Sequence, residues 1–399
     1  MATTLTLTAE PPIKASTSPW SSGRRIPELD GLRGLAILMV LVRHCVYETN
    51  FAGGHHWPSY LVVASSLTWS GVDLFFILSG FLIGGILLDA RSSPNYFKTF
   101  YARRVFRIIP IYAVLVSTFY LFLFAEFQGW VPPSNWLFGP NVPWYGYATF
   151  TQNLQWAAGG PNFTNWLTPT WSLAVEEQFY LVLPALLWFV SGRKLFYVLG
   201  SAILAAPLLR LFLDLHYAHG QMASFCLMPC RADSLLLGVV AAILVRDRSI
   251  WESLQRQRRW LVFAWIVLLA GVQFFIFFNQ ADPILSFWMT ALGFSWMALF
   301  YLGLLLLGLI YTGGWLGRIL RTTWLKALGT ISYAVYLIHK PVLGLTFAIV
   351  RSRHPWPWAE TSGERLLILL SLAITIAIAS LSWRYFEKPL LKIGHSMKY

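Results

Sequence analysis

Charged residues are scarce in this chain. Of its 399 residues 12% are charged, while 57% are hydrophobic and 17% aromatic, and a soluble domain usually carries about 25% charged residues. A lipid bilayer accounts for this balance, because each helix that spans it needs roughly 20 apolar residues. The composition therefore argues against an ordinary soluble domain and predicts an all-α, polytopic integral membrane protein.

Acidic residues are few as well: the 17 of them are outnumbered by 30 basic residues, which gives a formal net charge of +13. Such an excess is typical of proteins that bind nucleic acids. It is also typical of membrane proteins whose Lys and Arg collect in cytoplasmic loops. The long apolar runs favour the second class, so we expect membrane lipids and no nucleic acid among the partners.

Cysteine is rare too, with only Cys45, Cys226 and Cys230. The chain has no CxxC pair and no His/Cys cluster with zinc spacing, so we expect no metal site. We interpret all three cysteines as small packing residues. The alternatives are a pair between Cys226 and Cys230, and a nucleophilic Cys45 beside His44.

Residues 1–30 are polar and rich in Pro, Ser and Thr, which predicts a disordered cytoplasmic tail. They lack a short apolar stretch followed by a small-residue cleavage site, so we expect no cleaved signal peptide. The transmembrane domain then covers 31–390, and 391–399 form a second cytoplasmic tail. Within the domain, apolar runs predict about ten spanning helices, at 32–50, 67–89, 107–127, 169–190, 195–213, 230–246, 260–279, 284–311, 327–349 and 364–385.

The positions of the basic residues predict the orientation in the inner (plasma) membrane. If both termini are cytoplasmic, most of the 30 basic residues fall on the cytoplasmic side, as the positive-inside rule requires. The long loop 128–168 has no Lys or Arg and is therefore expected outside. Its aromatic residues suit stacking on sugar rings and equally suit a belt at the membrane surface. They are Trp130, Trp136, Trp144, Trp156, Trp166, Tyr145 and Tyr147.

Arg33 and His44 lie inside the first predicted span, where a charged residue near the bilayer centre costs about 2.5–3.5 kcal/mol. Eleven residues of α-helix make three turns and roughly 20° more, so the two side chains share one helix face about 16 Å apart. An arginine at the cytoplasmic end suits phosphate binding, and a deeper imidazole suits proton abstraction from a hydroxyl. The alternative is a snorkelling arginine and a packed histidine.

Other polar groups occur at matching depth in later spans. Asp73 lies two turns into the second span, Glu176 in the outer half of the fourth, and His339 about midway along the ninth. We expect them to meet in a polar cavity that opens to both sides of the membrane, with Glu176, or else Asp73, orienting the imidazole of His44. The candidate substrate-binding residues are Glu177, Tyr180, Arg231, Asp233, Tyr336 and His339.

A second basic cluster follows the second span, in YARRVFRIIP at 101–110. Arg103 and Arg104 precede Arg107 by four and three residues, which places the three side chains on one helix face. As part of a cytoplasmic loop they would contact lipid headgroups. As part of a site they would bind the phosphates of a ligand together with Arg33.

These residues lie in stretches that resemble the membrane acyltransferase-3 family. ELDGLRGLAILMVLVRHC carries the family arrangement of an arginine, ten residues and a histidine on Arg33 and His44. Members are O-acetylases of lipopolysaccharide, exopolysaccharide and peptidoglycan, with relatives that acylate Nod factors and macrolides. Six further stretches match in order, from about Glu28 to Pro389. They are GVDLFFILSGFLI (71–83), YARRVFRIIPIY (101–112), TWSLAVEEQFYLVLP (170–184), RADSLLLG (231–238), ISYAVYLIHKP (331–341) and YFEKPL (385–390).

The resemblance implies an O-acyltransferase that moves an acyl group, expected to be acetyl, from cytoplasmic acyl-CoA to a hydroxyl of a sugar, glycan or glycolipid. It implies that Arg33 and His44 are both required. We expect Arg33, helped by Arg103, Arg104 or Arg107, to hold the CoA phosphates. The thioester then reaches His44, which acts as the catalytic base and needs no metal.

Two alternatives stay open. His44 either takes the proton of the acceptor hydroxyl or is itself acylated transiently. A proton-coupled transporter is the other functional class, because intramembrane histidines and carboxylates also serve proton transport. Some family members carry a C-terminal esterase-like domain. We expect none after Tyr399, and hence transfer directly to the acceptor or to a separate partner.

Overall fold

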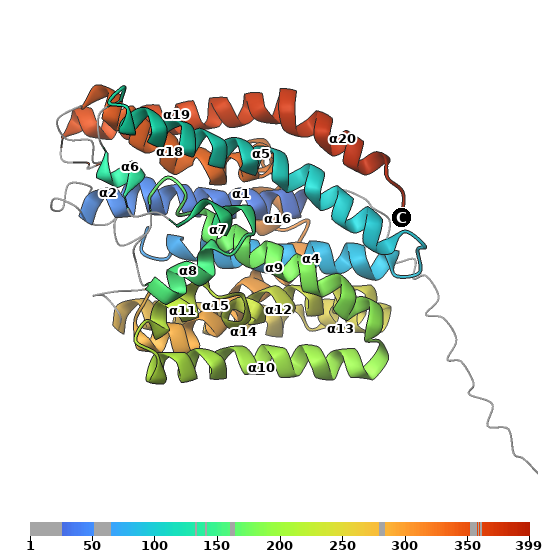
Figure 1. Cartoon of the computed structure of the whole chain (residues 1–399). Helices are drawn as coiled ribbons and strands as arrows, with labels where there is room; N and C mark the ends of the chain where they lie inside the picture. Colours follow the sequence, from blue (N-terminus) through green and yellow to red (C-terminus); the bar gives the residue numbers. More distant parts are fainter. Residues whose placement is uncertain are drawn as a thin grey trace, which may run out of the picture.

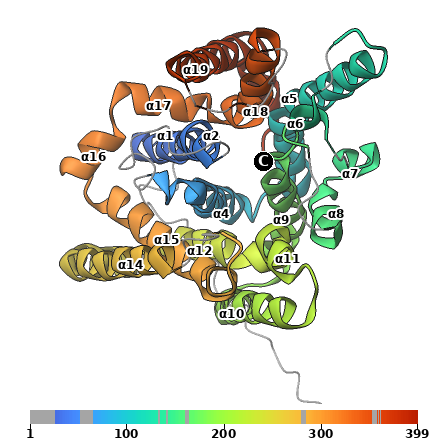
Figure 2. The same ribbon diagram turned by 90° about the vertical axis from the view of Figure 1, so that its left-hand side faces the viewer.

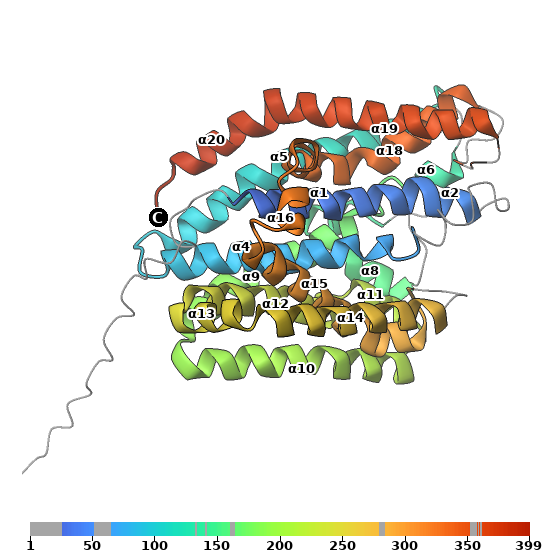
Figure 3. The same ribbon diagram turned by 180° about the vertical axis from the view of Figure 1, so that it is seen from behind.

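The computed structural model describes residues 26–51, 65–131, 134–139, 142–159, 164–278, 284–351, 357, 359 and 361–399. Within these residues every regular element is a helix. The long helices lie side by side along one direction and form a bundle (Figure 1). The view from behind shows the same common direction of the helices (Figure 3). The predicted all-α fold is confirmed. The predicted N-terminal tail lies, up to residue 25, outside the described residues.

In the part of the chain that the structure describes, eight helical segments are long and apolar enough to cross a membrane: Thr68–Ala90, Tyr96–Phe127, Gly192–His216, Gly220–Arg246, Arg258–Phe277, Met289–Ile310, Ser332–Val350 and Ser362–Ser396. They contain the helices η2 (Thr68–Ser70), α4 (Gly71–Ala90), α5 (Tyr96–Phe127), α10 (Gly192–His216), α11 (Gly220–Cys226), α12 (Met228–Arg246), α14 (Arg258–Phe278), η3 (Met289–Gly293), α15 (Phe294–Ile310), α18 (Ser332–Val350), α19 (Ser362–Ser382), η4 (Trp383–Glu387) and α20 (Lys388–Ser396).

The two remaining predicted spans are helices as well. The first is a continuous helical rod made of α1 (Pro27–Val42), the π-helical turn η1 (Arg43–Tyr47) and α2 (Glu48–Phe51), and the other is α9 (Thr170–Phe189). Both carry charged residues within their length, which makes them less apolar than the other eight. Seen end-on, α1 and α4 occupy the middle of the bundle and other helices surround them (Figure 2). The helix that carries Arg33 is therefore enclosed by other helices.

Shorter helices complete the fold. α6 (Asn135–Phe138), α7 (Trp144–Ala148) and α8 (Gln152–Gly159) occupy the long loop before α9, and α13 (Arg248–Arg256) follows α12. α16 (Trp315–Leu320) and α17 (Thr323–Thr330) connect α15 to α18 and pack across α1. Sequence reasoning began the ninth span at residue 327, but the helix breaks at Ile331, so α17 and α18 are separate.

Helices α4 and α12 run parallel and in close contact, because glycines let their backbones meet. A Cβ at Gly80 would overlap the carbonyl of Leu235, and a Cβ at Gly238 would overlap the carbonyl of Ile77. Small residues at such a crossing are the usual way that membrane helices approach closely. The contact fixes the depth of α12 against α4, so that polar residues at matching positions on the two helices face each other.

One end of the bundle collects the basic segments that the sequence placed on a single side. Arg246 at the end of α12 is paired with Asp89 at the end of α4, at 2.8 Å. The C-terminal backbone reaches the first turns of α5, where Arg103 donates a hydrogen bond to the carbonyl of Met397 at 2.6 Å. The helices of the loop that lacks Lys and Arg, α6, α7 and α8, lie in the other half of the bundle (Figure 1).

Candidate active site

Two cavities lie inside the bundle, one after the other along its axis. The first, here called the arginine cavity, has a volume of about 120 Å³ and is lined by Arg33, Arg104 and Arg107. The second, the histidine cavity, has a volume of about 280 Å³ and is lined by His44. Both are lined by Val72 of α4 and Tyr336 of α18.

The arginine cavity brings together most of the predicted donor-binding residues. Arg33 comes from α1, and Arg104 and Arg107 from α5, which begins eleven residues before the predicted span and so carries the basic cluster on a helix. Glu176 and Tyr180 of α9 line the same cavity. The Tyr180 hydroxyl donates to Glu176 Oε2 at 3.0 Å. Three guanidinium groups against one carboxylate leave this cavity suited to an anionic ligand.

Four of the predicted site residues line neither the arginine cavity nor the histidine cavity: Arg103, Glu177, Asp233 and His339. The Arg103 guanidinium donates to the Met397 carbonyl and lies over the ring of Tyr399, 4.6 Å from its centroid. The C-terminal residues therefore bind Arg103 on the outside of α5, while Arg104 and Arg107 turn inward.

His44 lies in the π-helical turn η1, where each backbone hydrogen bond spans five residues instead of the four of an α-helix. Its Nδ1 lies 2.9 Å from Nε2 of His339 on α18. Its other ring nitrogen, Nε2, lies 3.5 Å from Oε1 of Glu48, four residues further along the same rod. Both imidazole nitrogens thus face a defined partner.

The hydrogen bonds of His339 fix which nitrogen of His44 is free. His339 Nδ1 lies 2.8 Å from the carbonyl of Tyr336 and 3.2 Å from that of Val335. Carbonyl oxygens only accept, so His339 carries its proton on Nδ1 and accepts on Nε2. The donor on that bond is therefore His44 Nδ1–H. The neutral His44 ring then has its lone pair on Nε2, on the side of Glu48, and can accept a proton there.

Sequence reasoning missed Glu48 and Lys340. Glu48 Oε2 lies 3.3 Å from Lys340 Nζ, and Lys340 also donates to Asn165 Oδ1 at 3.0 Å. Glu48 is four residues from His44, a spacing that places two side chains of one helix in contact, and this signal was available. Lys340 follows His339 directly, but only the packing of α18 against the first helix brings it to Glu48.

The groups expected to orient His44 have other partners in the structure. Glu176 is bonded to Tyr180 in the arginine cavity. Asp73 lines the histidine cavity and is paired with Arg231. Among the contacts of the described residues, His44 is oriented by His339 and Glu48 instead.

Tyr336 forms part of the wall between the two cavities. Its hydroxyl is hydrogen-bonded to Ser172 Oγ of α9 at 2.6 Å, and its ring meets Phe75 of α4 with 6.1 Å between centroids. Its carbonyl holds the His339 ring. Tyr336 of α18 therefore contacts two other helices, α4 and α9, at the boundary and is joined to the histidine pair.

Arg231 and Asp233, both predicted to bind substrate, separate in the structure. Arg231 lines the histidine cavity beside Asp73. Asp233 is instead paired with Arg210 of α10 at 3.0 Å. Both pairs are almost completely buried.

The aromatic residues of the long outer loop have two kinds of surroundings. Trp130 and Trp144 are 71% and 68% exposed, as expected for residues at a membrane surface. Trp156 and Trp166 are buried, and Trp156 lines the histidine cavity together with Trp69 of η2. The cavity that contains His44 is therefore partly walled by indole rings.

The three cysteines have different surroundings, and Cys226 lines the histidine cavity. All three are buried and free, and Cys45 lines an apolar groove between α1, α17 and α19 instead of the histidine cavity. Among the residues that the structure describes, no three His, Cys, Asp or Glu side chains gather closely enough to hold a metal ion.

Comparison with known proteins gives a family and several relatives. A family model for an acyltransferase domain matches residues 26–384. The chain is 28% identical over 398 residues to the peptidoglycan O-acetyltransferase OatA of Listeria monocytogenes, a match that covers 94% of this chain and 57% of the relative. It is 27% identical over 400 residues to the putative peptidoglycan O-acetyltransferase YrhL of Bacillus subtilis, covering 93% and 56%.

A putative O-acetyltransferase of Staphylococcus aureus is 25% identical over 397 residues, covering 93% of this chain and 58% of the relative. The chain thus spans between 56% and 58% of the length of these curated relatives. No solved structure matches it.

Proposed function

The chain belongs to the membrane acyltransferase-3 family, and from that premise we propose that it transfers an acyl group, expected to be acetyl, from acyl-CoA to a hydroxyl of a glycan. The observation that carries the proposal is the pair of adjoining cavities. One is lined by three arginines and the other by His44, and both are lined by Tyr336 and Val72. The proposal puts the donor in the first cavity and the acceptor in the second.

The donor end of the proposal rests on charge. Acyl-CoA carries several phosphate groups, and planar guanidinium groups bind phosphate oxygens in pairs. Arg33, Arg104 and Arg107 supply three such groups within one cavity at the end of the bundle where basic segments gather. That end is the cytoplasmic one under the positive-inside rule, and acyl-CoA is a cytoplasmic metabolite.

The reaction itself falls to His44. Its Nε2 accepts the proton of the acceptor hydroxyl while the hydroxyl oxygen attacks the thioester carbonyl, and the thiolate of CoA leaves and takes up that proton. Glu48, 3.5 Å from Nε2, stabilises the imidazolium that forms. His339 holds the ring from the other side, so that Nε2 faces the reactants throughout.

The thioester reaches His44 only by passing the boundary between the cavities. Tyr336 and Val72 line both sides of that boundary. We propose that the pantetheine arm displaces the Tyr336 hydroxyl from Ser172 as it enters. Because the Tyr336 carbonyl also accepts a hydrogen bond from His339, binding of the donor would shift the hydrogen bonds of the His44–His339 pair.

The acceptor class rests on two supports. The relatives named for their activity are O-acetyltransferases, and two of those names specify peptidoglycan. The histidine cavity has indole rings in its wall, and such rings pack against the apolar faces of sugars. A glycan hydroxyl is therefore the acceptor that we propose.

The test uses the purified protein in lipid nanodiscs with radiolabelled acetyl-CoA and peptidoglycan oligosaccharides. We expect labelled acetyl esters to form with the wild type and not with His44→Ala, while His44→Ala still binds CoA. Ester formation by His44→Ala at the wild-type rate would contradict the mechanism. A wild type that transfers no acetyl but carries a solute with protons across the membrane would replace it with transport.

A further inference from the structure

Three side chains on one part of the histidine cavity have polar atoms with no hydrogen-bond partner among the described residues. They are Asp73 Oδ2, Arg231 Nε and Nη1, and Trp69 Nε1. Asp73 and Arg231 are each 1% exposed, and Trp69 is 6% exposed. A buried polar group without a partner costs about 1–3 kcal/mol, and more when it is charged. Such atoms are retained where something else satisfies them.

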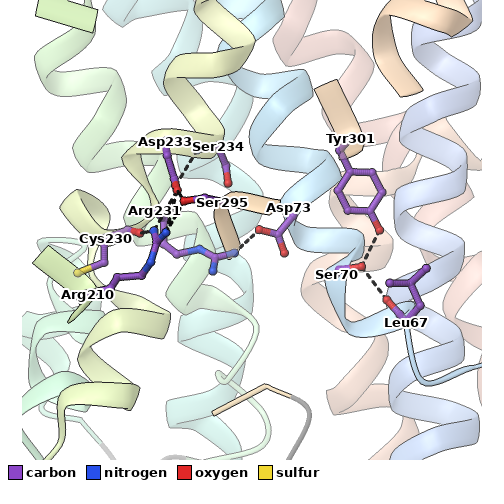
Figure 4. A network of polar contacts seen from close by, with 10 residues as sticks. All are labelled: Leu67, Ser70, Asp73, Arg210, Cys230, Arg231, Asp233, Ser234, Ser295 and Tyr301. Carbon is purple, nitrogen blue, oxygen red and sulfur yellow. Dashed lines mark hydrogen bonds and ion pairs between the residues drawn. The ribbon is translucent and has the colours of Figure 1, made fainter. Parts of the chain in front are cut away.

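The second buried ion pair on α12 shows that the fold can satisfy such groups when they are structural. Asp233 accepts from the backbone of Ser234 at 2.9 Å and from Ser295 at 2.6 Å, besides its pair with Arg210. Arg210 donates to Asp233, Ser295 and the carbonyl of Cys230, which leaves only its Nε unpaired. Figure 4 shows the two pairs next to each other.

Arg231 presents the contrasting case. In Figure 4 its side chain extends away from the Arg210 cluster toward Asp73, and the dashed line to Asp73 is its only bond drawn. Two of its three guanidinium nitrogens are unpaired. Asp73 and Arg231 line the histidine cavity, whereas Asp233 and Arg210 do not. Of the two ion pairs, the one that lines the cavity therefore has the larger number of unpaired polar atoms.

We propose that Asp73, Arg231 and Trp69 form a subsite that binds two neighbouring polar groups of the acceptor sugar, beside the hydroxyl that His44 deprotonates. This inference rests on the proposed function. Side by side, the pair offers one carboxylate oxygen that accepts and two guanidinium nitrogens that donate. Vicinal hydroxyls, or a hydroxyl beside an acetamido group, present the complementary donor and acceptors.

The charge of the pair selects a neutral group. Asp73 and Arg231 neutralise each other, so a phosphate or carboxylate at this place would gain little. The indole of Trp69 adds a further donor, and the neighbouring rings of Trp171 and Phe225 supply apolar surface for the face of a sugar. A molecule with a single hydroxyl would leave every one of these bonds unmade.

The experiment compares acceptors on the reconstituted full chain with acetyl-CoA. The probes are the methyl glycoside of N-acetylglucosamine, its monodeoxy analogues, and n-butanol, which has one hydroxyl. For the wild type we expect kcat/KM with the glycoside to exceed that with n-butanol, and removal of either bound neighbour to lower it by about 10- to 100-fold, the effect of losing hydrogen bonds to a charged pair. The wild-type series requires no variant to fold.

Two variants then assign the effect to residues. Arg231→Lys keeps the charge opposite Asp73 and loses the extra donors, so we expect about a tenfold or greater loss with the glycoside, a far smaller loss with n-butanol, and an unchanged KM for acetyl-CoA. Trp69→Phe removes one N–H and should act in the same direction by a few-fold. Arg210→Lys, in the structural pair, should lower thermal stability and affect both acceptors alike.

The outcomes separate this inference from the proposed function. If the wild type acylates n-butanol and the glycoside equally well, or if Arg231→Lys weakens both to the same extent, the subsite is wrong while acyl transfer stands. If the wild type acylates no hydroxyl probe, acyl transfer to hydroxyls is wrong and the subsite falls with it.

Discussion

His44 Nδ1 and His339 Nε2 lie 2.9 Å apart, although the two residues are separated by 295 positions in the sequence. Because His339 Nδ1 is bound to backbone carbonyls, this contact orders the protons along the pair and leaves His44 Nε2 free to act as a base. The two histidines, which the sequence placed at similar depth, are thus hydrogen-bonded to each other and have different roles: His44 can accept a proton, and His339 orients it.

The first prediction follows from that inequality. His44→Ala and His44→Gln should each lower the rate of acetyl transfer by about 10²- to 10⁴-fold, because neither side chain accepts a proton at neutral pH. His339→Ala should lower it by about 5- to 30-fold, since it removes one orienting hydrogen bond worth roughly 1–2 kcal/mol. Single-turnover kinetics with purified variants would measure both. A dead His339→Ala with an active His44→Ala would reverse the roles.

Glu48→Gln tests the stabilisation of the imidazolium. The variant keeps the shape of the side chain but loses the charge that faces both His44 Nε2 and Lys340 Nζ. We expect kcat to fall by about 10- to 100-fold with an unchanged KM for acetyl-CoA, because the interaction matters most when the ring is protonated. Glu252→Gln, on the exposed helix α13, is the matched control and should be neutral. An equal fall for both would remove Glu48 from the mechanism.

The contact between Glu48 and Lys340 could not be predicted from the sequence, unlike the long helices. Hydropathy predicted every long helix, and the motif around Arg33 and His44 indicated one residue in the wall of each cavity, because these signals are local. Glu48 lies at the polar end of the first apolar run, beside Thr49 and Asn50, where an acidic residue is expected to face water. Its ion pair with Lys340 depends on how α18 packs against the first helix.

The π-helical turn at His44 was also beyond reach. An α-helical wheel describes the stretch from Arg33 to Val42, whereas His44 lies in a turn at Arg43–Tyr47 whose backbone hydrogen bonds span five residues instead of four. Which carbonyl an N–H selects is decided by tertiary packing. The same holds for the two ion pairs of α12. The spacing of Arg231 and Asp233 does not predict that Arg231 pairs with Asp73 of α4 while Asp233 pairs with Arg210 of α10.

The arginines give a prediction in which neighbours behave differently. Arg33→Lys, Arg104→Lys and Arg107→Lys should each weaken acetyl-CoA binding by about tenfold, since lysine keeps the charge but loses paired contacts to phosphate. Arg103→Lys should leave the affinity unchanged, because Arg103 binds Met397 and Tyr399 outside the cavity. Calorimetric titration with CoA would measure all four. Equal weakening by Arg103→Lys and Arg104→Lys would contradict the arginine cavity as the donor site.

Close contact of α4 and α12 predicts a cost for a single methyl group. In Gly80→Ala the new Cβ would overlap the Leu235 carbonyl, which is backbone and cannot rotate away. We expect a loss of about 1–3 kcal/mol, as for other overpacked sites, read as a lower midpoint of thermal unfolding in detergent. Gly200→Ala on α10 is the control, because its Cβ would meet open space. It should be neutral or stabilising by up to about 1 kcal/mol.

The last prediction concerns the side of the membrane that each end of the bundle faces. Tyr145 of α7 and Gln255 of α13 are both exposed, and the three native cysteines are buried, so a single introduced cysteine gives a clean signal at either position. We place the basic end in the cytoplasm, because Arg248, Arg256 and their neighbours would otherwise break the positive-inside rule. An impermeant thiol reagent added to intact cells should therefore label Tyr145→Cys and spare Gln255→Cys, and permeabilised cells should allow both. Labelling of Gln255→Cys alone in intact cells would show that the protein has the opposite orientation in the membrane. The arginine cavity would then open to the outside, where acyl-CoA is absent, and the donor that we propose would be wrong with it.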